Sequence, residues 1–150
     1  MEHKLELERL AEMYVFGILP AERLPAAAAD ALEAGLDSPS LRQLAGADDD
    51  DTESIRNLFN KSLNELGVPL PSPSEAALSI ARRIAGDIVR GKIDPYEGAR
   101  QIWGKIYVRF PQLTELRPFV AYASDYQDNA AHRDDYCRLI LEASKKLLSG

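Results

Sequence analysis

The sequence predicts an all-α protein, a bundle of seven or eight short amphipathic helices joined by glycine and proline turns. Apolar residues recur every three or four positions, β-branched residues are sparse, and glycines and prolines divide the chain into segments of helical length. With 150 residues, 45% of them hydrophobic and 28% charged, the chain is long enough to bury a core. We therefore expect a single helical domain, residues 1–150, with two halves, 1–67 and 72–150.

The first two helices are predicted from their apolar stripes and from the glycines that follow them. One runs from about residue 4 to 16 and stops at Gly17, and the second covers roughly 22–34 and stops at Gly35. Glycine is favoured after a helix because it adopts the left-handed conformation that ends the last turn. Each stop therefore predicts the boundary of a helix.

A short third helix and a longer fourth helix complete the first half. Ser38 is expected to cap the third helix, with Pro39 in its first turn and Gly46 at its end. The fourth helix follows Asp48–Asp51 and closes at Gly67. The four aspartates lack the alternating spacing of a calcium loop, so we interpret them as an acidic helix start and expect no bound metal.

Residues 69–73 contain three prolines, which exclude a regular helix and predict an extended linker between the halves. Ser72 and Glu75 then form the pattern of a capping box, in which each side chain bonds the other residue's backbone. The helix that follows is expected to end near Arg90.

Residues 86–92 fit the spacing G-x-x-x-x-G-K of a phosphate-binding loop. Such a loop needs a preceding strand and a Ser or Thr after the lysine, whereas Gly86 falls inside an amphipathic pattern and Lys92 is followed by Ile93 and Asp94. We therefore interpret the stretch as a turn between two helices.

The residues around this turn each suit a helix boundary. Gly91 is expected to stop one helix, and Asp94 to cap the next, with Pro95 at its first position and Glu97 as the reciprocal partner of the cap. Gly98 leaves room for a close approach by a neighbouring helix. The stripe that follows is expected to be buried, including the single tryptophan: Ala99, Ile102, Trp103, Ile106 and Phe110.

The last two helices follow Pro111. Phe119, Tyr122, Ala123 and Tyr126 mark one face of the first, and Asn129 is the expected cap of the second. The apolar face of the final helix comprises Tyr136, Ile140, Ala143 and Leu147, and the lone Cys137 beside it is expected to be an inert, partly buried side chain.

Charge and composition exclude several classes of function. The net charge is −6, and residues 1–74 hold fourteen acidic side chains against six basic ones. Such a field opposes nucleic acids and anionic lipids and favours basic partners. No apolar run is long enough to cross a membrane, so we expect a cytoplasmic protein without membrane contact.

Catalytic and metal chemistry find little support in the sequence. One cysteine and two histidines cannot assemble a Cys/His zinc site, and the titratable residues of segment 122–136 fall into no catalytic pattern. We expect no catalytic residues, no metal and no cofactor, and hence a protein that is not an enzyme.

Tyrosines interleaved with aspartates favour a protein-binding surface in the last third of the chain. Tyrosine supplies a large amphipathic contact area, and carboxylates complement a basic partner. The predicted partner-binding residues are Tyr122, Asp125, Tyr126, Asp128, Asp134, Asp135 and Tyr136. Exposed apolar faces would also allow a homodimer.

The alternative function is a helical nucleic-acid-binding regulator. Segment 82–109 carries seven cations around its helix–turn–helix: Arg82, Arg83, Arg90, Lys92, Arg100, Lys105 and Arg109. Asp94 and Glu97 in the turn, together with the acidic first half, oppose this function. We expect much of the positive charge to pair within the protein.

Three stretches resemble a group of small helical bacterial proteins whose function is uncharacterised: GKIDPYEGARQIW (91–103), LRPFVAYASDYQD (116–128) and LPAAAADALEAGLDSPSLRQLAG (24–46). The resemblance covers most of the chain and implies a helical fold but no activity. Small acidic helical proteins of this size are often immunity proteins that neutralise a toxin. By that analogy, we expect an immunity or inhibitor protein that binds a basic, toxin-like partner.

Overall fold

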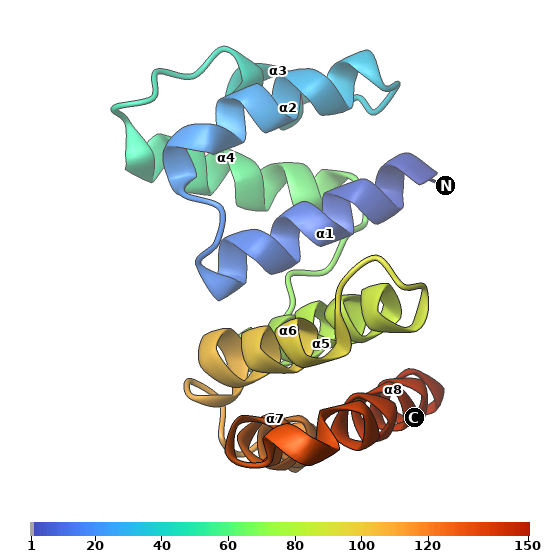
Figure 1. Ribbon diagram of the computed structural model, residues 1–150. Helices are drawn as coiled ribbons and strands as arrows, with labels where there is room; N and C mark the ends of the chain where they lie inside the picture. Colours follow the sequence, from blue (N-terminus) through green and yellow to red (C-terminus); the bar gives the residue numbers. More distant parts are fainter. Residues whose placement is uncertain (1) are drawn as a thin grey trace. The chain divides into compact units, whose positions relative to one another are not determined.

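The computed structural model describes residues 2–150 and contains eight α-helices and no strand within that range (Figure 1). The predicted all-α class is therefore confirmed. The chain forms two compact units, Met1–Ala76 and Ala77–Gly150. The single domain expected from the sequence stays a prediction.

The first unit is built from four helices and one short 3-10 turn (Figure 1, blue to green). Their bounds are α1 (Glu2–Phe16), η1 (Ala21–Arg23), α2 (Leu24–Glu33), α3 (Pro39–Ala45) and α4 (Thr52–Glu65). Helix α3 packs against both α2 and α4. Tyr14 of α1 meets Phe59 of α4 edge to face, with ring centres 5.2 Å apart, so aromatic packing joins the first helix to the last.

The second unit contains the remaining four helices, apart from the first four residues of α5, which fall in the first unit (Figure 1, yellow-green to red). Their bounds, with those of the shorter turns, are α5 (Pro73–Val89), α6 (Pro95–Gln101), η2 (Ile102–Tyr107), η3 (Thr114–Leu116), α7 (Arg117–Asp128), η4 (Ala130–His132) and α8 (Arg133–Ser149). Helix α8 packs on α6 and α7. Phe119 of α7 and Ile140 of α8 are fully buried, as their apolar stripes predicted.

The predicted helix boundaries are confirmed at most positions. Gly17, Gly35, Gly67 and Gly91 have positive φ. Ser38 accepts a hydrogen bond from the Leu41 amide, and Asp51 caps α4 in the same way.

Of three further predicted side-chain caps, the one at Ser72 is complete, whereas those at Asp94 and Asn129 differ from the prediction. The Ser72–Glu75 capping box is complete, with both reciprocal bonds at 3.1–3.2 Å. At Asp94 only half of the box forms, because the Glu97 carboxylate bonds Arg100 and Gln101 instead. Asn129 does not cap the last helix: its side chain donates to the Asp125 carbonyl and so closes α7.

The stretch with phosphate-loop spacing is a turn, as predicted. Gly86 lies inside α5, and Gly91 adopts φ +75° two residues after the last residue of the helix. The amides of Gly91 and Lys92 donate to the carbonyls of Ile88 and Asp87, at 3.1 and 2.8 Å. These amides satisfy the end of α5 and so cannot cradle a phosphate.

The helix that begins at α6 continues as a π-helix over Ile102–Tyr107, which the sequence did not predict. The Val108 amide donates to the carbonyl of Trp103, five residues earlier. The wider turn changes which residues share a face. Ile102 and Ile106 remain buried, whereas Trp103, expected in the core, is half-buried.

Gly98 provides the close helix contact that the sequence predicted. A Cβ atom at this position would lie 2.5 Å from Cδ1 and 2.6 Å from Cγ1 of Ile88. Ile88 is itself buried in α5. The missing side chain therefore lets α6 approach α5 across the turn.

Glu65 makes the first unit sensitive to acid. Its carboxylate accepts hydrogen bonds from the Ser40 hydroxyl at 2.6 Å and from the Ser40 amide at 3.0 Å, which joins α4 to the start of α3. These bonds hold the pKa of Glu65 below its ordinary value of 4.5. Because the folded pKa is the lower one, the stabilisation is complete above pH 4.5 and is lost as the pH falls through the folded value.

We expect Glu65→Gln to reduce the dependence of stability on acid. The difference in urea midpoint between pH 7 and pH 3.5 should be smaller in this variant than in the wild type. Glu53→Gln, an exposed change on the same helix, is the matched control and should keep the wild-type difference. If the difference in urea midpoint in Glu65→Gln equals that of the wild type, the Ser40 bonds contribute nothing to the acid dependence of stability.

Candidate functional site

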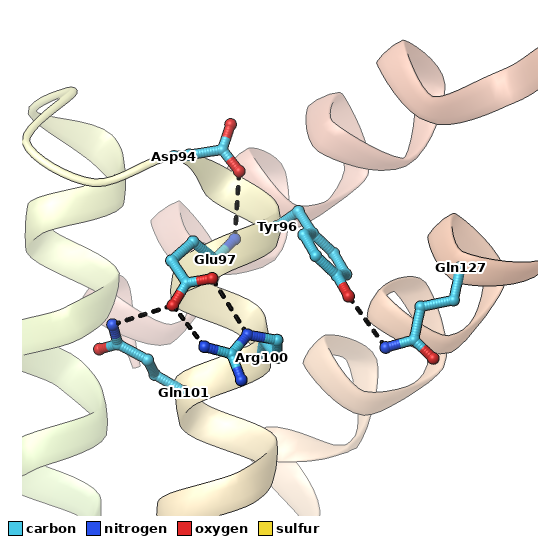
Figure 2. Close-up of polar contacts among 6 residues, drawn as sticks. All are labelled: Asp94, Tyr96, Glu97, Arg100, Gln101 and Gln127. Atoms are coloured by element: carbon cyan, nitrogen blue, oxygen red, sulfur yellow. Dashed lines mark hydrogen bonds and ion pairs between the residues drawn. The ribbon is translucent and has the colours of Figure 1, made fainter. Parts of the chain in front are cut away.

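The first turn of α6 forms one edge of the candidate site (Figure 2). Asp94 caps the helix by accepting from the Glu97 amide at 3.1 Å. The Glu97 carboxylate then holds the Arg100 guanidinium through two bonds, at 2.7 and 3.0 Å. This contact lowers the pKa of Glu97, so the pair remains charged at neutral pH. These bonds link the cap of α6 to Glu97 and Arg100.

Two tyrosines stack across α6 and α7. The rings of Tyr96 and Tyr126 lie 4.0 Å apart, centre to centre, and are inclined by 11°. Figure 2 shows Gln127 reaching the Tyr96 hydroxyl, to which its amide nitrogen donates at 2.9 Å. Both tyrosines are half-buried. Stacking and hydrogen bonding therefore set the positions of both rings.

Arg133, the first residue of α8, completes this arrangement. Its guanidinium carbon lies 4.8 Å from the centre of the Tyr126 ring, within the range of a cation–π contact. Three helices thus contribute to one cluster, which we call the tyrosine–arginine stack: Tyr96, Tyr126 and Arg133.

The sequence pattern indicated Tyr126 as a site residue but neither Tyr96 nor Arg133. Tyr96 was visible as an aromatic residue in the first turn of a helix, between Asp94 and Glu97. Its partner lies thirty positions further along the chain, and only the packing of α6 on α7 brings them together.

The predicted aspartates divide into two groups. Asp135 contacts Arg138 at 3.2 Å and lies 3.5 Å from Nδ1 of His132, so its charge is used within α8. Asp125, Asp128 and Asp134 are exposed, and no ion pair within the described part of the chain involves them. We call these three the open carboxylates. In the sequence they are close neighbours of Tyr126 and Arg133, two of them at the end of α7 and one at the start of α8.

The other predicted tyrosines have different surroundings. Tyr136 is half-buried on α8. Tyr122, one turn before Tyr126, lines a cavity of about 690 Å³ in the second unit together with side chains of α5, α7 and α8. The structure therefore places Tyr122 beside a hollow and Tyr126 in the stack.

Within residues 2–150, no three His, Cys, Asp or Glu side chains gather as a metal site would require. Burial, followed by the charge of Asp94, raises the pKa of the Cys137 thiol. The thiol is therefore protonated at neutral pH and is a weak nucleophile.

The basic segment 82–109 is partly neutralised by its own acidic residues. Arg90 pairs with Asp87 at 3.2 Å, and Arg100 pairs with Glu97 at 2.7 Å. Both pairs lie on exposed helix surface. They reduce the positive charge that the segment offers to phosphates.

Comparisons with protein-family models, curated proteins and solved structures found no match. Across residues 2–150, no helix combines the length and the apolar character that a bilayer crossing requires.

Proposed function

We propose that this protein acts by binding a basic protein partner, with the tyrosine–arginine stack at the centre of the contact and the open carboxylates around it. The observation that supports the proposal is that two tyrosines and an arginine contact one another beside three exposed carboxylates. Anchors that are already fixed lose little side-chain entropy on binding, so more of the contact energy appears as affinity.

Charge supports the choice of a basic partner. Residues 125–138 carry four aspartates, at 125, 128, 134 and 135, and two arginines, at 133 and 138. This segment therefore has a net negative charge. The open carboxylates remain hydrated in the free protein and can pair with lysine or arginine on an incoming surface. Such charges mainly accelerate encounter and select the partner. The analogy with immunity proteins makes a basic toxin the first partner to test.

Removal of the open carboxylates should weaken the complex. We expect Asp125→Asn/Asp128→Asn/Asp134→Asn to lower affinity by about tenfold, since each exposed pair contributes roughly 0.2–1 kcal/mol. The measurement is affinity capture from an extract of the organism that encodes the protein, with the full chain as bait and the retained proteins quantified by mass spectrometry. The wild type should retain a basic protein in near-stoichiometric amount.

A matched control removes three charges elsewhere. Asp49→Asn/Asp50→Asn/Glu53→Gln alters exposed residues near the start of α4 and should retain as much partner as the wild type. Equal losses from both triple variants would contradict the proposed surface. If the wild type retains only nucleic acid, in a salt-sensitive manner, the regulator function is favoured instead.

A further inference from the structure

The cavity beside Tyr122 has the size and walls of a small-molecule site. Its volume of about 690 Å³ falls within the range of roughly 300–1,000 Å³ that is usual for ligand pockets. Its apolar wall comes from α7 and α8 and comprises Pro118, the Tyr122 ring, Leu139, Ala143 and Leu147. Leu139 is 40% exposed although it lines this hollow. An apolar ligand would cover surface that is now in contact with water.

Arg82 of α5, which pairs with none of the described side chains, lies at one side of the same cavity. Nε of Arg82 is buried, and no atom of residues 2–150 accepts a hydrogen bond from it. Arg82 forms no ion pair among the described side chains, in contrast to Arg90, which directly follows the same helix. Arg82 also lines the cavity, so an anion there would meet a guanidinium that pairs with none of the described side chains and could donate charge-assisted hydrogen bonds to it.

The other charges at the cavity do not cancel this preference. Lys146 adds a second cation to the lining, whereas Glu115 and Glu142 add two carboxylates. Both carboxylates belong to exposed residues, and Glu142 lies 3.8 Å from Lys145. Solvent screens exposed charges, while the partly buried guanidinium acts in a medium of lower dielectric constant. The strongest electrostatic feature of the hollow is therefore positive.

We propose that this cavity binds an amphipathic monocarboxylate of the medium-chain fatty-acid class. The carboxylate accepts from the Arg82 guanidinium, and the alkyl chain lies along Leu139 and Leu147. This binding does not rest on the proposed protein–protein contact, because the residues that line the cavity include no member of the tyrosine–arginine stack and none of the open carboxylates.

Isothermal titration of the full chain with decanoate and with decanol tests the proposal. We expect one decanoate per chain, bound at least tenfold more tightly than decanol, because only decanoate presents an anion to Arg82. Arg82→Met should reduce decanoate affinity to that of decanol. Arg90→Met, a change directly after the same helix at a residue that pairs with Asp87, should leave decanoate binding unchanged.

A second pair of variants tests the apolar wall without touching the buried guanidinium. Leu139→Gln should weaken decanoate and decanol alike, and Leu148→Gln, an exposed change on the same helix, should weaken neither. Thermal melts establish that each variant is folded. Equal affinity for decanoate and decanol, or wild-type binding by either Arg82→Met or Leu139→Gln, would overturn the proposal.

Discussion

Gly98→Val is expected to destabilise the second unit by about 3 kcal/mol, at the upper end of the usual cost of overpacking a core. The new Cβ would lie 2.5–2.6 Å from two carbons of Ile88, whose side chain is buried and so has little freedom to move. Relief of the clash requires α6 to move away from α5 or Ile88 to leave its position. Urea unfolding followed by the fluorescence of Trp103, the single tryptophan, reports on this unit.

Two controls separate the clash from a general loss of glycine. A Cβ atom at Gly104, in the π-helix, would meet nothing within 4 Å, so Gly104→Ala should change stability by no more than about 0.5 kcal/mol. Ile88→Ala removes the obstructing atoms, and combined with Gly98→Val it should cost less than the sum of the two single changes. Strict additivity would show that Gly98 and Ile88 do not oppose each other.

Tyr126→Ala is expected to cause the largest loss of partner binding among single changes at the proposed surface, about 2 kcal/mol or roughly thirtyfold in Kd. The substitution removes the ring that stacks on Tyr96 and supports the Arg133 guanidinium, so all three anchors lose their fixed positions. The measurement is the Kd of the captured partner, with the unfolding midpoint recorded in parallel so that affinity is compared between folded proteins.

Tyr126→Phe is the matched control for this loss. It retains the aromatic face that contacts Tyr96 and Arg133 and should keep the Kd within about threefold of the wild type. If Tyr126→Ala binds as tightly as the wild type, the stack is a structural feature of the second unit and not a contact for the partner.

Much of the fold could be predicted from the sequence because its helix boundaries depend on local chemistry. A positive φ at Gly91 and a side-chain cap at Asp94 follow from residue types within a few positions of each other. The close approach at Gly98 was also predictable, since a glycine within an apolar helix face indicates that another element occupies the space. Ile88 as the specific neighbour came only from the structure.

Competition between equally reasonable partners explains the errors in the helix caps. The Asn129 side chain can cap either the start of the helix that follows or the end of the helix that precedes. It donates a hydrogen bond to the Asp125 carbonyl and so caps the end of α7. The Glu97 carboxylate likewise accepts charge-assisted hydrogen bonds from Arg100, one turn away. It therefore does not accept the bond from the Asp94 amide that would complete the capping box. The π-helix at Ile102–Tyr107 has no sequence signal that we can identify.

The candidate site was predictable in location but not in organisation. Alternating tyrosines and aspartates indicated the segment from 122 to 136, yet spacing along one helix could not reveal that Tyr126 stacks on Tyr96 while Tyr122 lines a cavity. Nor could it separate Asp135, which pairs with Arg138, from the open carboxylates. These distinctions arise from the packing of α6, α7 and α8, which the sequence pattern does not encode locally.

Hydrogen–deuterium exchange on the complex with the captured partner shows which part of the chain the partner covers. Binding at the tyrosine–arginine stack should slow amide exchange over residues 125–136 and in the first turn of α6, while amides of α4 exchange as in the free protein. Slowed exchange confined to the first unit, with residues 125–136 unchanged, would show that the partner does not bind at the tyrosine–arginine stack.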